Sequence, residues 1–223
     1  DKAIYTDDGL RYSDAVTVSV DSATFDGSML NIKFSAVEGP DIEGIDPTTI
    51  TPTVMVGLYG YDTKDFIVGA HERLIDDNGD GAIDRSDQRA LEFEVGAEHP
   101  RFTTVAAEGG SWEVTADLSP WTDLIADNTV KRVEIGVLPA LANADGVMVA
   151  VSAASRTFDL AANDFADDFY APIAKVEGGC DTCHDALGVT FHEPSYGGSI
   201  VVCRMCHITK AGGDTQAIEV FDD

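Results

Sequence analysis

The sequence predicts a mainly β protein, with an N-terminal antiparallel Greek-key barrel or sandwich and a small irregular C-terminal segment. Three observations support this fold class. Short runs of alternating apolar and polar residues recur through the first three quarters of the 223-residue chain, and such alternation is typical of strands with one buried face. No long stretch follows the helical period. The last quarter is rich in glycine and poor in such runs, so it has little from which to build a core.

The clearest alternation lies in residues 16–20 and 30–37. The turn sequence Asp26-Gly27-Ser28 separates these two runs, which predicts a β-hairpin. Several short strands at modest spacing favour an antiparallel all-β domain. Trp112 and Trp121 are expected to pack in this domain as large apolar side chains. Further strands, separated by clusters of Gly, Pro, Asp and Asn, are expected at 53–59, 111–116, 132–137 and 147–151.

The composition changes after about Arg156, where an acidic stretch dotted with aromatic residues, 163–169, leads toward the C-terminus. We therefore expect a β domain over residues 1–163 and a second segment over 164–223. The second segment contains three Gly-Gly pairs. A segment this short and this rich in glycine cannot fold around side chains alone, so it needs a bound group to supply most of its apolar interior.

Two copies of Cys-x-x-Cys-His indicate what that group is, and together they use all four cysteines. Two thiols at this spacing each add to one vinyl group of a porphyrin, and the histidine that follows becomes the proximal iron ligand. Zinc and disulfides are the alternatives, but a zinc ribbon does not require a histidine after each second cysteine. We therefore expect two covalently bound haem c groups, packed within the C-terminal segment. The expected attachment residues are Cys180, Cys183 and His184 for the first haem and Cys203, Cys206 and His207 for the second.

The ligands on the far side of each iron must come from elsewhere in the chain. Of the five histidines, three remain after the two motifs are counted. His192 lies between the motifs and is expected to ligate one of the irons, but the sequence does not decide which. His71 and His99, in the β domain, are the further candidates, although a lone histidine there is more often structural. The methionines are weaker candidates, and Met205, inside its own motif, should not reach the opposite face of that haem.

A second motif lies within the β region, where residues 76–87 match the twelve-residue calcium loop. The last position of the loop holds an aspartate in place of the usual glutamate, and this shorter ligand admits magnesium in some loops. We expect Ca²⁺ to rigidify a long loop rather than to signal, because no clear pair of amphipathic helices flanks it. An acidic turn without an ion is the alternative. The predicted ligands are Asp76, Asn78, Asp80, the carbonyl of Ala82, Asp84 and Asp87, with Gly81 at the turn.

The chain carries 40 acidic and 14 basic residues, for a formal net charge of −26. This balance removes the largest electrostatic term in nucleic-acid binding and disfavours anionic membranes. It should attract cations and positively charged partners, an effect that salt screens, although a solvated surface adapted to a salty habitat explains it equally well. No apolar run approaches the roughly 18 residues of a transmembrane helix. The N-terminus shows no signal-peptide pattern. We expect an exported chain without its signal peptide, at the outer cell surface or outside the cell.

Several stretches resemble the outer-membrane multihaem cytochromes of the OmcA/MtrC type. The resemblance implies electron transfer at the cell surface to extracellular acceptors, through closely spaced haems with two histidine ligands each. Those proteins carry many more haems, in two multihaem modules, whereas this chain stops soon after its second motif. We therefore expect either a fragment of a longer cytochrome or a protein that works by assembly. The stretches are 158–172, 191–194 and 201–207, together with 58–61 and 114–118, which are compatible with that family's N-terminal Greek-key barrel domain.

The expected function is that of an electron carrier rather than an enzyme: a dihaem c-type cytochrome that passes electrons between haems of neighbouring subunits or partner cytochromes toward an extracellular acceptor. Stacked copies would form a polymeric wire. Two alternatives stay open. A haem enzyme or a gas or redox sensor needs an open iron position, which arises if only one of the spare histidines ligates. A calcium-stabilised β adhesion module carrying structural haems is the other.

Overall fold

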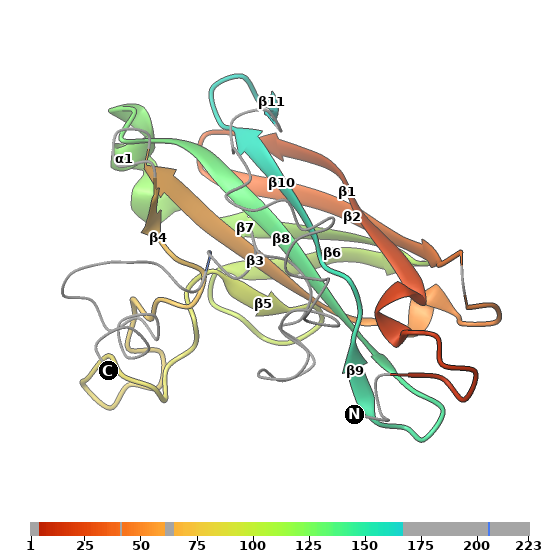
Figure 1. Cartoon of the computed structure of the whole chain (residues 1–223). Helices are drawn as coiled ribbons and strands as arrows, with labels where there is room; N and C mark the ends of the chain where they lie inside the picture. Colours follow the sequence, from red (N-terminus) through yellow and green to blue (C-terminus); the bar gives the residue numbers. More distant parts are fainter. Residues whose placement is uncertain (1–4, 41, 61–64, 167–204, 206–223) are drawn as a thin grey trace.

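A computed structural model describes residues 5–40, 42–60, 65–166 and 205 of this chain. The described part forms two antiparallel sheets that pack face to face (Figure 1). The mainly β fold class is therefore confirmed, in the form of a sandwich. Each of the six strands expected from the sequence is present, and so is the hairpin turn; the strand bounds are given below.

The first sheet has four strands in the order β1-β2-β7-β6. Its hairpin β1–β2 is closed by the expected turn, where Oδ1 of Asp26 accepts hydrogen bonds from the amides of Met29 at 2.7 Å and Ser28 at 3.0 Å. These two backbone hydrogen bonds hold the pKa of Asp26 below its usual value, and the bond from Met29 has the larger effect. The strands are β1 (Val16–Phe25), β2 (Met29–Glu38), β6 (Phe102–Glu108) and β7 (Ser111–Asp117).

The second sheet follows the order β11-β10-β8-β3-β4, with β5 also paired to β3 and β9 to β8. Its longest pairing joins β3 and β8, two strands that are far apart in the sequence. The strands are β3 (Thr51–Gly60), β4 (Asp65–Val68), β5 (Glu92–Glu94), β8 (Val130–Ala142), β9 (Met148–Ala150), β10 (Ala154–Asp159) and β11 (Asp164–Phe165). The short helices are η2 (Tyr12–Asp14), η3 (Pro47–Thr49), η4 (Ser119–Trp121) and α1 (Thr122–Ala126).

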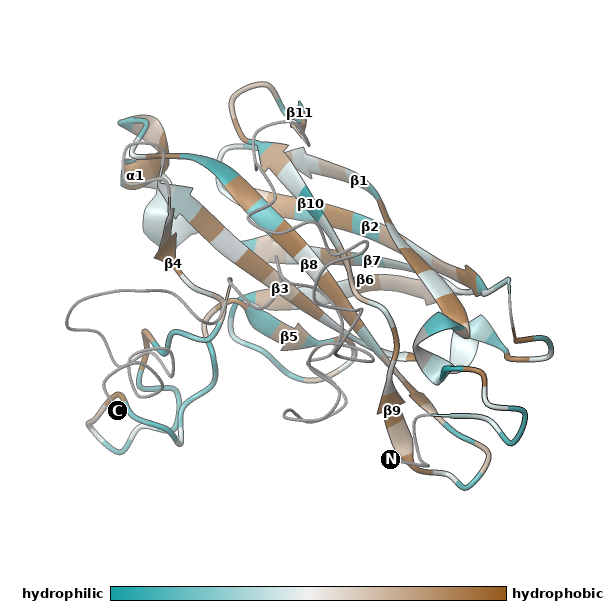
Figure 2. Cartoon of the chain, in the orientation of Figure 1, coloured by the Kyte–Doolittle hydropathy of each residue, from teal (hydrophilic) through white to brown (hydrophobic). Residues whose placement is uncertain are grey.

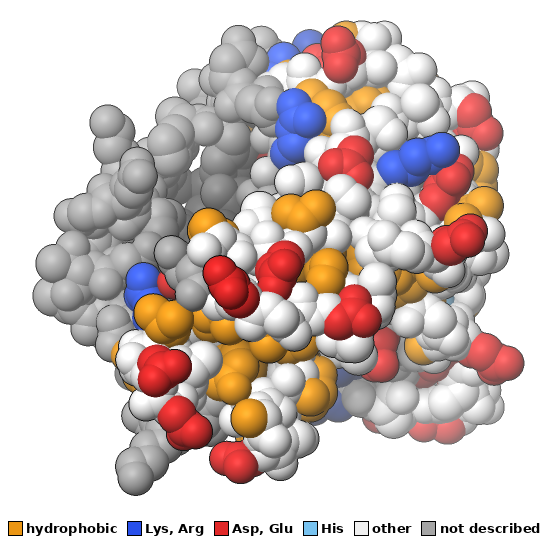
Figure 3. Space-filling view, turned by 90° about the vertical axis from the view of Figure 1, so that its right-hand side faces the viewer, with side chains coloured by type: hydrophobic (Ala, Val, Ile, Leu, Met, Phe, Trp, Pro, Cys, Tyr) orange, Lys and Arg blue, Asp and Glu red, His pale blue; other side chains and the backbone are white. Residues whose placement is uncertain are grey.

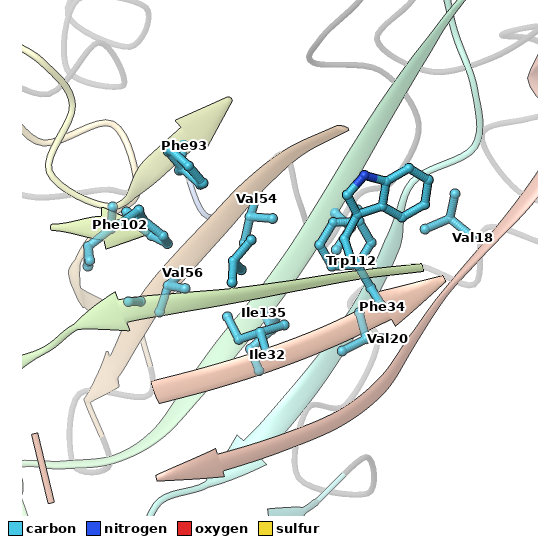
Figure 4. Close-up of a cluster of buried hydrophobic side chains, with 14 of the residues drawn as sticks. Val18, Val20, Ile32, Phe34, Val54, Val56, Phe93, Phe102, Trp112 and Ile135 are labelled. Carbon is cyan, nitrogen blue, oxygen red and sulfur yellow. The ribbon is translucent and has the colours of Figure 1, made fainter. Parts of the chain in front are cut away.

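The main core lies between the two sheets, where inward-facing side chains of both sheets meet (Figure 4). Phe34 and Trp112 are direct cross-strand partners on β2 and β7, and their rings stack with centroids 5.3 Å apart. Ile135 on β8 and Val54 and Val56 on β3 complete this part of the core from the opposite sheet, and all three are fully buried. Trp112 and Trp121 are each 8% exposed, which confirms their expected packing role.

The strand β3 differs from the others because it is buried on both of its faces. Every residue from Pro52 to Gly60 is buried, and Figure 2 colours most of this strand from white to brown, the neutral to hydrophobic part of the scale. A strand with one solvent face alternates instead, as the first half of β1 does. The outer face of β3 therefore has its own cover, which the next subsection describes.

The sequence analysis missed strands near the end of the β domain. We expected residues after Arg156 to lead into a linker, but β10 pairs with β8 along its whole length, and Phe158 is fully buried. Asn163 then accepts a hydrogen bond from the amide of Phe25 at 2.7 Å, and β11 pairs with β10. The sheet thus continues a few residues beyond the expected boundary at 163.

The stacked pair at the centre of the core predicts a large effect of its removal. Phe34→Ala is expected to lower the free energy of unfolding by about 3–5 kcal/mol. Loss of the Phe34 ring leaves a cavity beside Trp112, and the two sheets cannot move together far enough to fill it. Val37 on the same strand is 57% exposed, so Val37→Ala should change stability by no more than about 0.5 kcal/mol. Urea denaturation followed by tryptophan fluorescence measures both, and equal effects would contradict this description of the core.

Candidate functional site

Most residues of the two haem motifs lie outside the described residues, so the structure says nothing about their geometry. These are Cys180, Cys183, His184, Cys203, Cys206 and His207, and the candidate distal ligand His192, between the motifs, also lies outside the described residues. Four other features are described: Met205, inside the second motif, the candidate ligands His71 and His99, and the calcium-type loop 76–87. The candidate site is built from these.

Met205 is completely buried and belongs to a second apolar cluster, separate from the core between the sheets. We call this the outer cluster; it covers the outer face of β3. Tyr59 and Phe66 meet there edge to face, with ring centroids 5.6 Å apart and planes at 82°. The members of the outer cluster are Met55, Tyr59, Phe66, Ala70, Leu138 and Met205. The second Cys-x-x-Cys-His motif therefore contacts the β domain through its third residue.

A backbone hydrogen bond joins the same two parts of the chain. The amide of Ala70 donates to the carbonyl of Met205 at 3.1 Å. The segment that carries Ala70 is itself held by pairing with the segment before β5: the amide of Ala90 donates to the carbonyl of Glu72 at 2.7 Å, and that of Leu91 donates to the carbonyl of Ala70 at 3.3 Å. The candidate ligand His71 lies between these anchored residues, directly beside the point where the motif touches the β domain.

His71 is buried, with a residue exposure of 7%. Its Nε2 lies 2.5 Å from a carboxylate oxygen of Glu92, and the other oxygen of Glu92 accepts a hydrogen bond from Arg89 at 2.6 Å. Burial raises the pKa of Glu92, but the hydrogen bond from His71 and the charges of His71 and Arg89 outweigh it, so the pKa lies below its usual value. Glu92 is therefore an anion that orients the imidazole of His71.

His99 is held differently, because both of its ring nitrogens are used by the backbone. Its Nδ1 accepts from the amides of Arg101 at 3.0 Å and Phe102 at 3.2 Å, so Nε2 carries the proton and donates to the carbonyl of Arg89 at 2.9 Å. The ring also meets Phe93 and Phe102 edge to face. Ligation of iron by His99 would break these backbone contacts. Its geometry is that of a structural histidine that ties the start of β6 to the segment before β5.

The loop 76–87 closes on itself through its own acidic side chains. The carboxylate of Asp76 accepts from the amides of Gly79, Asp80 and Gly81 at 2.6–3.1 Å. Asp87 is 4% exposed and accepts from the amides of Asp77 and Asp84 at 3.0 and 2.8 Å. Figure 2 shows that this loop, between β4 and β5, is mostly hydrophilic. The first and last ligand positions of the predicted loop thus act as acceptors for its turns.

The other predicted calcium ligands accept backbone hydrogen bonds in the same way. Asn78 and Asp80 accept from amides two residues ahead at 2.8 and 2.9 Å, and Asp84 from the amide of Ser86 at 2.8 Å. The hydrogen bond from the amide of Ser86 is the main cause that lowers the pKa of Asp84. The hydrogen bond from the amide of Asp84 is the main cause that lowers the pKa of Asp87. Within the described ranges, no group of three or more His, Cys, Asp or Glu side chains is arranged to hold a metal ion. Calcium remains a prediction.

The surface agrees with the charge balance of the sequence. Acidic side chains are spread over the face shown in Figure 3 rather than gathered in one patch. Among the described residues, no helix is long and apolar enough to cross a membrane.

Sequence reasoning did not find the outer cluster. The signal was present in β3, where 53–59 is apolar at successive positions rather than at alternate ones. Such a run indicates a strand covered on both faces, but it does not say what covers the outer one. The partner, Met205, lies far away in the sequence.

The neutral, half-buried state of His99 predicts a pH dependence of stability. Burial first, then the charge of Arg101, hold its pKa below the usual value, against the hydrogen bond to Arg89 and the charges of Asp77 and Glu92. The unfolded chain therefore binds a proton that the folded chain does not, and the stability that His99 contributes is present above about pH 6.5 and is lost as the pH falls below it.

The substitution His99→Asn keeps an acceptor near the position of Nδ1 and removes the titrating group. Urea midpoints between about pH 5 and pH 7.5 should fall on acidification for the unaltered chain and fall less for the variant. Identical pH profiles for the two chains would contradict the assignment of His99 as a neutral, half-buried residue.

No protein-family model matches the sequence, and neither does any curated protein. Two solved structures resemble the chain in fold. The crystal structure of MtrC from Shewanella baltica OS185 has 16% sequence identity and a TM-score of 0.48, over 92% of this chain and 32% of that one. The crystal structure of the outer membrane decaheme cytochrome OmcA has 13% identity and a TM-score of 0.51, over 90% of this chain and 30% of that one. This chain thus spans about a third of the length of each. At this identity the likeness to OmcA concerns the fold alone, and for the fold the expected resemblance is confirmed.

Proposed function

We propose that this protein is an extracellular electron carrier with two covalently bound haem c groups, whose second haem lies against the β domain beside His71. The observation that carries the proposal is the burial of Met205, a residue of the second Cys-x-x-Cys-His motif, in the outer cluster. The amide of Ala70, the residue before His71, bonds to the carbonyl of Met205. The fold shared with OmcA supports this reading.

The described residues around Met205 suit a bound haem. The outer cluster supplies apolar surface of the kind that excludes water from a porphyrin edge, and His71 offers an imidazole close by. A histidine that ligates a metal commonly passes its other ring N–H to a carboxylate, which fixes the ring. Glu92 provides such a carboxylate on Nε2 of His71, so ligation through Nδ1 would leave that contact intact. A haem iron in this position would exchange single electrons without forming or breaking bonds.

Among the two β-domain candidates, we assign the distal position on the second haem to His71 and a structural role to His99. Both ring nitrogens of His99 bond to backbone groups, whereas Nε2 of His71 contacts the side-chain carboxylate of Glu92. The remaining candidate, His192, then belongs to the first haem. Each iron has two histidine ligands in this assignment, with His184 and His207 on the proximal faces.

Electrons would pass between this chain and other copies of it or other cytochromes, toward an acceptor outside the cell. The net charge of −26 favours partners with basic docking surfaces, with association that weakens as salt rises. Stacking of copies into a wire is the extended form of this proposal. Sedimentation at high protein concentration separates monomers from such stacks.

A second candidate function is supported by one contact. If His71 stays on Glu92 at 2.5 Å through Nε2 and does not reach an iron, and His99 stays on the backbone, only His192 remains for two irons. One haem would then keep an open position for a gas or a small reactant, which is the arrangement of a sensor or a haem enzyme.

Carbon monoxide distinguishes the two functions, because it binds a reduced haem iron that has an open position. The reduced, unaltered protein should contain two haems by pyridine haemochrome assay and show no spectral shift with carbon monoxide. His71→Ala should open one iron and bind about one carbon monoxide per protein, whereas His99→Ala should bind none. A shift in the unaltered protein would favour the sensor or enzyme, and a chain without covalent haem would overturn both functions.

We also propose that the loop 76–87 binds Ca²⁺ with the ligands predicted from the sequence. The loop is already folded into tight turns by its own carboxylates, so an ion would add ligation to preformed geometry. At a calcium concentration about 100 times the dissociation constant, the melting temperature should rise by roughly 5–10 °C relative to chelator. Asp80→Asn keeps an acceptor for the amide of Ala82 and removes a charged ligand, so the rise should shrink.

Asp145→Asn, an acidic-to-amide change in an exposed turn outside the loop, is the matched control and should keep the full rise. Melting that is identical in calcium and in chelator would show that the motif is an acidic turn without an ion.

A further inference from the structure

We propose that Met205 is a positioning residue that seats the second haem on the outer face of the second sheet, so that the β domain sets the environment of that haem. This inference rests on the proposed function and goes beyond it, because it assigns a role to a residue that is neither a haem attachment point nor an iron ligand. It also makes the β domain part of the redox site.

The first step is the short tether between Met205 and the two attachment residues. In the sequence, one peptide bond separates Met205 from Cys206 and two separate it from Cys203, and one peptide bond spans about 3.8 Å between Cα atoms. A porphyrin bound through both thiols cannot move away from the outer cluster while Met205 stays in it. Docking of one side chain therefore localises the whole macrocycle.

The second step is the packing of the outer cluster around the long side chain of Met205. Met55 on β3 and Leu138 on β8, both fully buried, take part in the cluster, and the edge-to-face pair of Tyr59 and Phe66 lies in it too. A thioether packs well in an irregular apolar gap and makes favourable contacts with aromatic rings. The carbonyl of Met205 is held at the same time by the amide of Ala70, so both the side chain and the backbone of Met205 are fixed.

The third step concerns Gly57, in the middle of β3. A Cβ at this position would lie 2.8 Å from the ring of Phe66 and 3.5 Å from Cε of Met205. A glycine at a buried strand position is otherwise unfavourable, because it weakens the strand and has no side chain to pack. The missing side chain leaves room for the Phe66 ring beside Met205, so β3 is shaped for this contact.

The consequence is functional because the potential of a haem depends on its burial and on the placement of its axial ligands. Loss of the Met205 side chain should loosen the second motif from the β domain, let water reach the second haem and displace it from His71. The first haem, attached by a different motif, serves as the internal reference.

The test compares four variants of the intact, haem-loaded chain. Met205→Ala should shift one of the two midpoint potentials and leave the other unchanged. Met205→Leu, which keeps a long apolar side chain, should leave that potential close to its value in the unaltered chain. Gly57→Ala should shift the same potential from the β-domain side, by pushing the Phe66 ring. Met148→Ala is the matched control, since Met148 on β9 is 38% exposed and outside the cluster. Hydrogen exchange at the Ala70 amide should become at least about tenfold faster in Met205→Ala.

Each outcome decides the proposal. Faster exchange at the Ala70 amide with both potentials unchanged would make Met205 a structural residue only. Unchanged exchange with unchanged potentials would show that Met205 does not hold the motif on the β domain. Either result overturns the inference, whereas the proposed function stands as long as the unaltered chain carries two haems. A chain that carries no haem overturns the function first. If Met205→Ala does not fold, Met205→Leu and Gly57→Ala carry the comparison, and unshifted potentials in Gly57→Ala count against the inference.

Discussion

The burial of β3 on both faces is the constraint on which the rest of the structure depends. One face of the strand packs into the core between the sheets, with Val54, Val56 and Leu58. The other packs into the outer cluster with Met55 and Tyr59. A strand this apolar would expose a hydrophobic patch if either cover were removed. The fold therefore needs a cover for the outer face of β3 in the second sheet, and Met205 of the second motif is part of that cover.

Two neighbouring residues connect these features. Ala70 belongs to the outer cluster and its amide bonds to the carbonyl of Met205, and the next residue, His71, contacts the carboxylate of Glu92. The calcium-type loop begins a few residues later. Just after the loop, Arg89 bonds to Glu92 and the amide of Ala90 bonds to the carbonyl of Glu72, next to His71. The residues that orient His71 thus adjoin the point where Met205 contacts the β domain, and the ends of the loop lie beside them.

The predictable part of this structure came from local patterns. The hairpin of β1 and β2 was evident because alternation and a turn sequence occur together in one short stretch, and β3, β7, β8 and β9 were evident from their apolar runs. Strand β10 was not, because Thr157 and Asp159 make its sequence polar and its burial comes from pairing with β8. The outer cluster could not be foreseen, since its contact joins residues that periodicity does not relate. The structural state of His99 depends on backbone amides that no side-chain pattern reveals.

The central claim is that the second haem sits against the β domain at His71. Anomalous diffraction at the iron edge from crystals of the haem-loaded chain tests it most directly, because it locates each iron without reference to any assumed ligand. Two iron peaks are expected, one of them within coordination distance of a ring nitrogen of His71 and adjacent to Met205 in the outer cluster. Two irons that both lie away from His71, with solvent or another group over the outer face of β3, would contradict it.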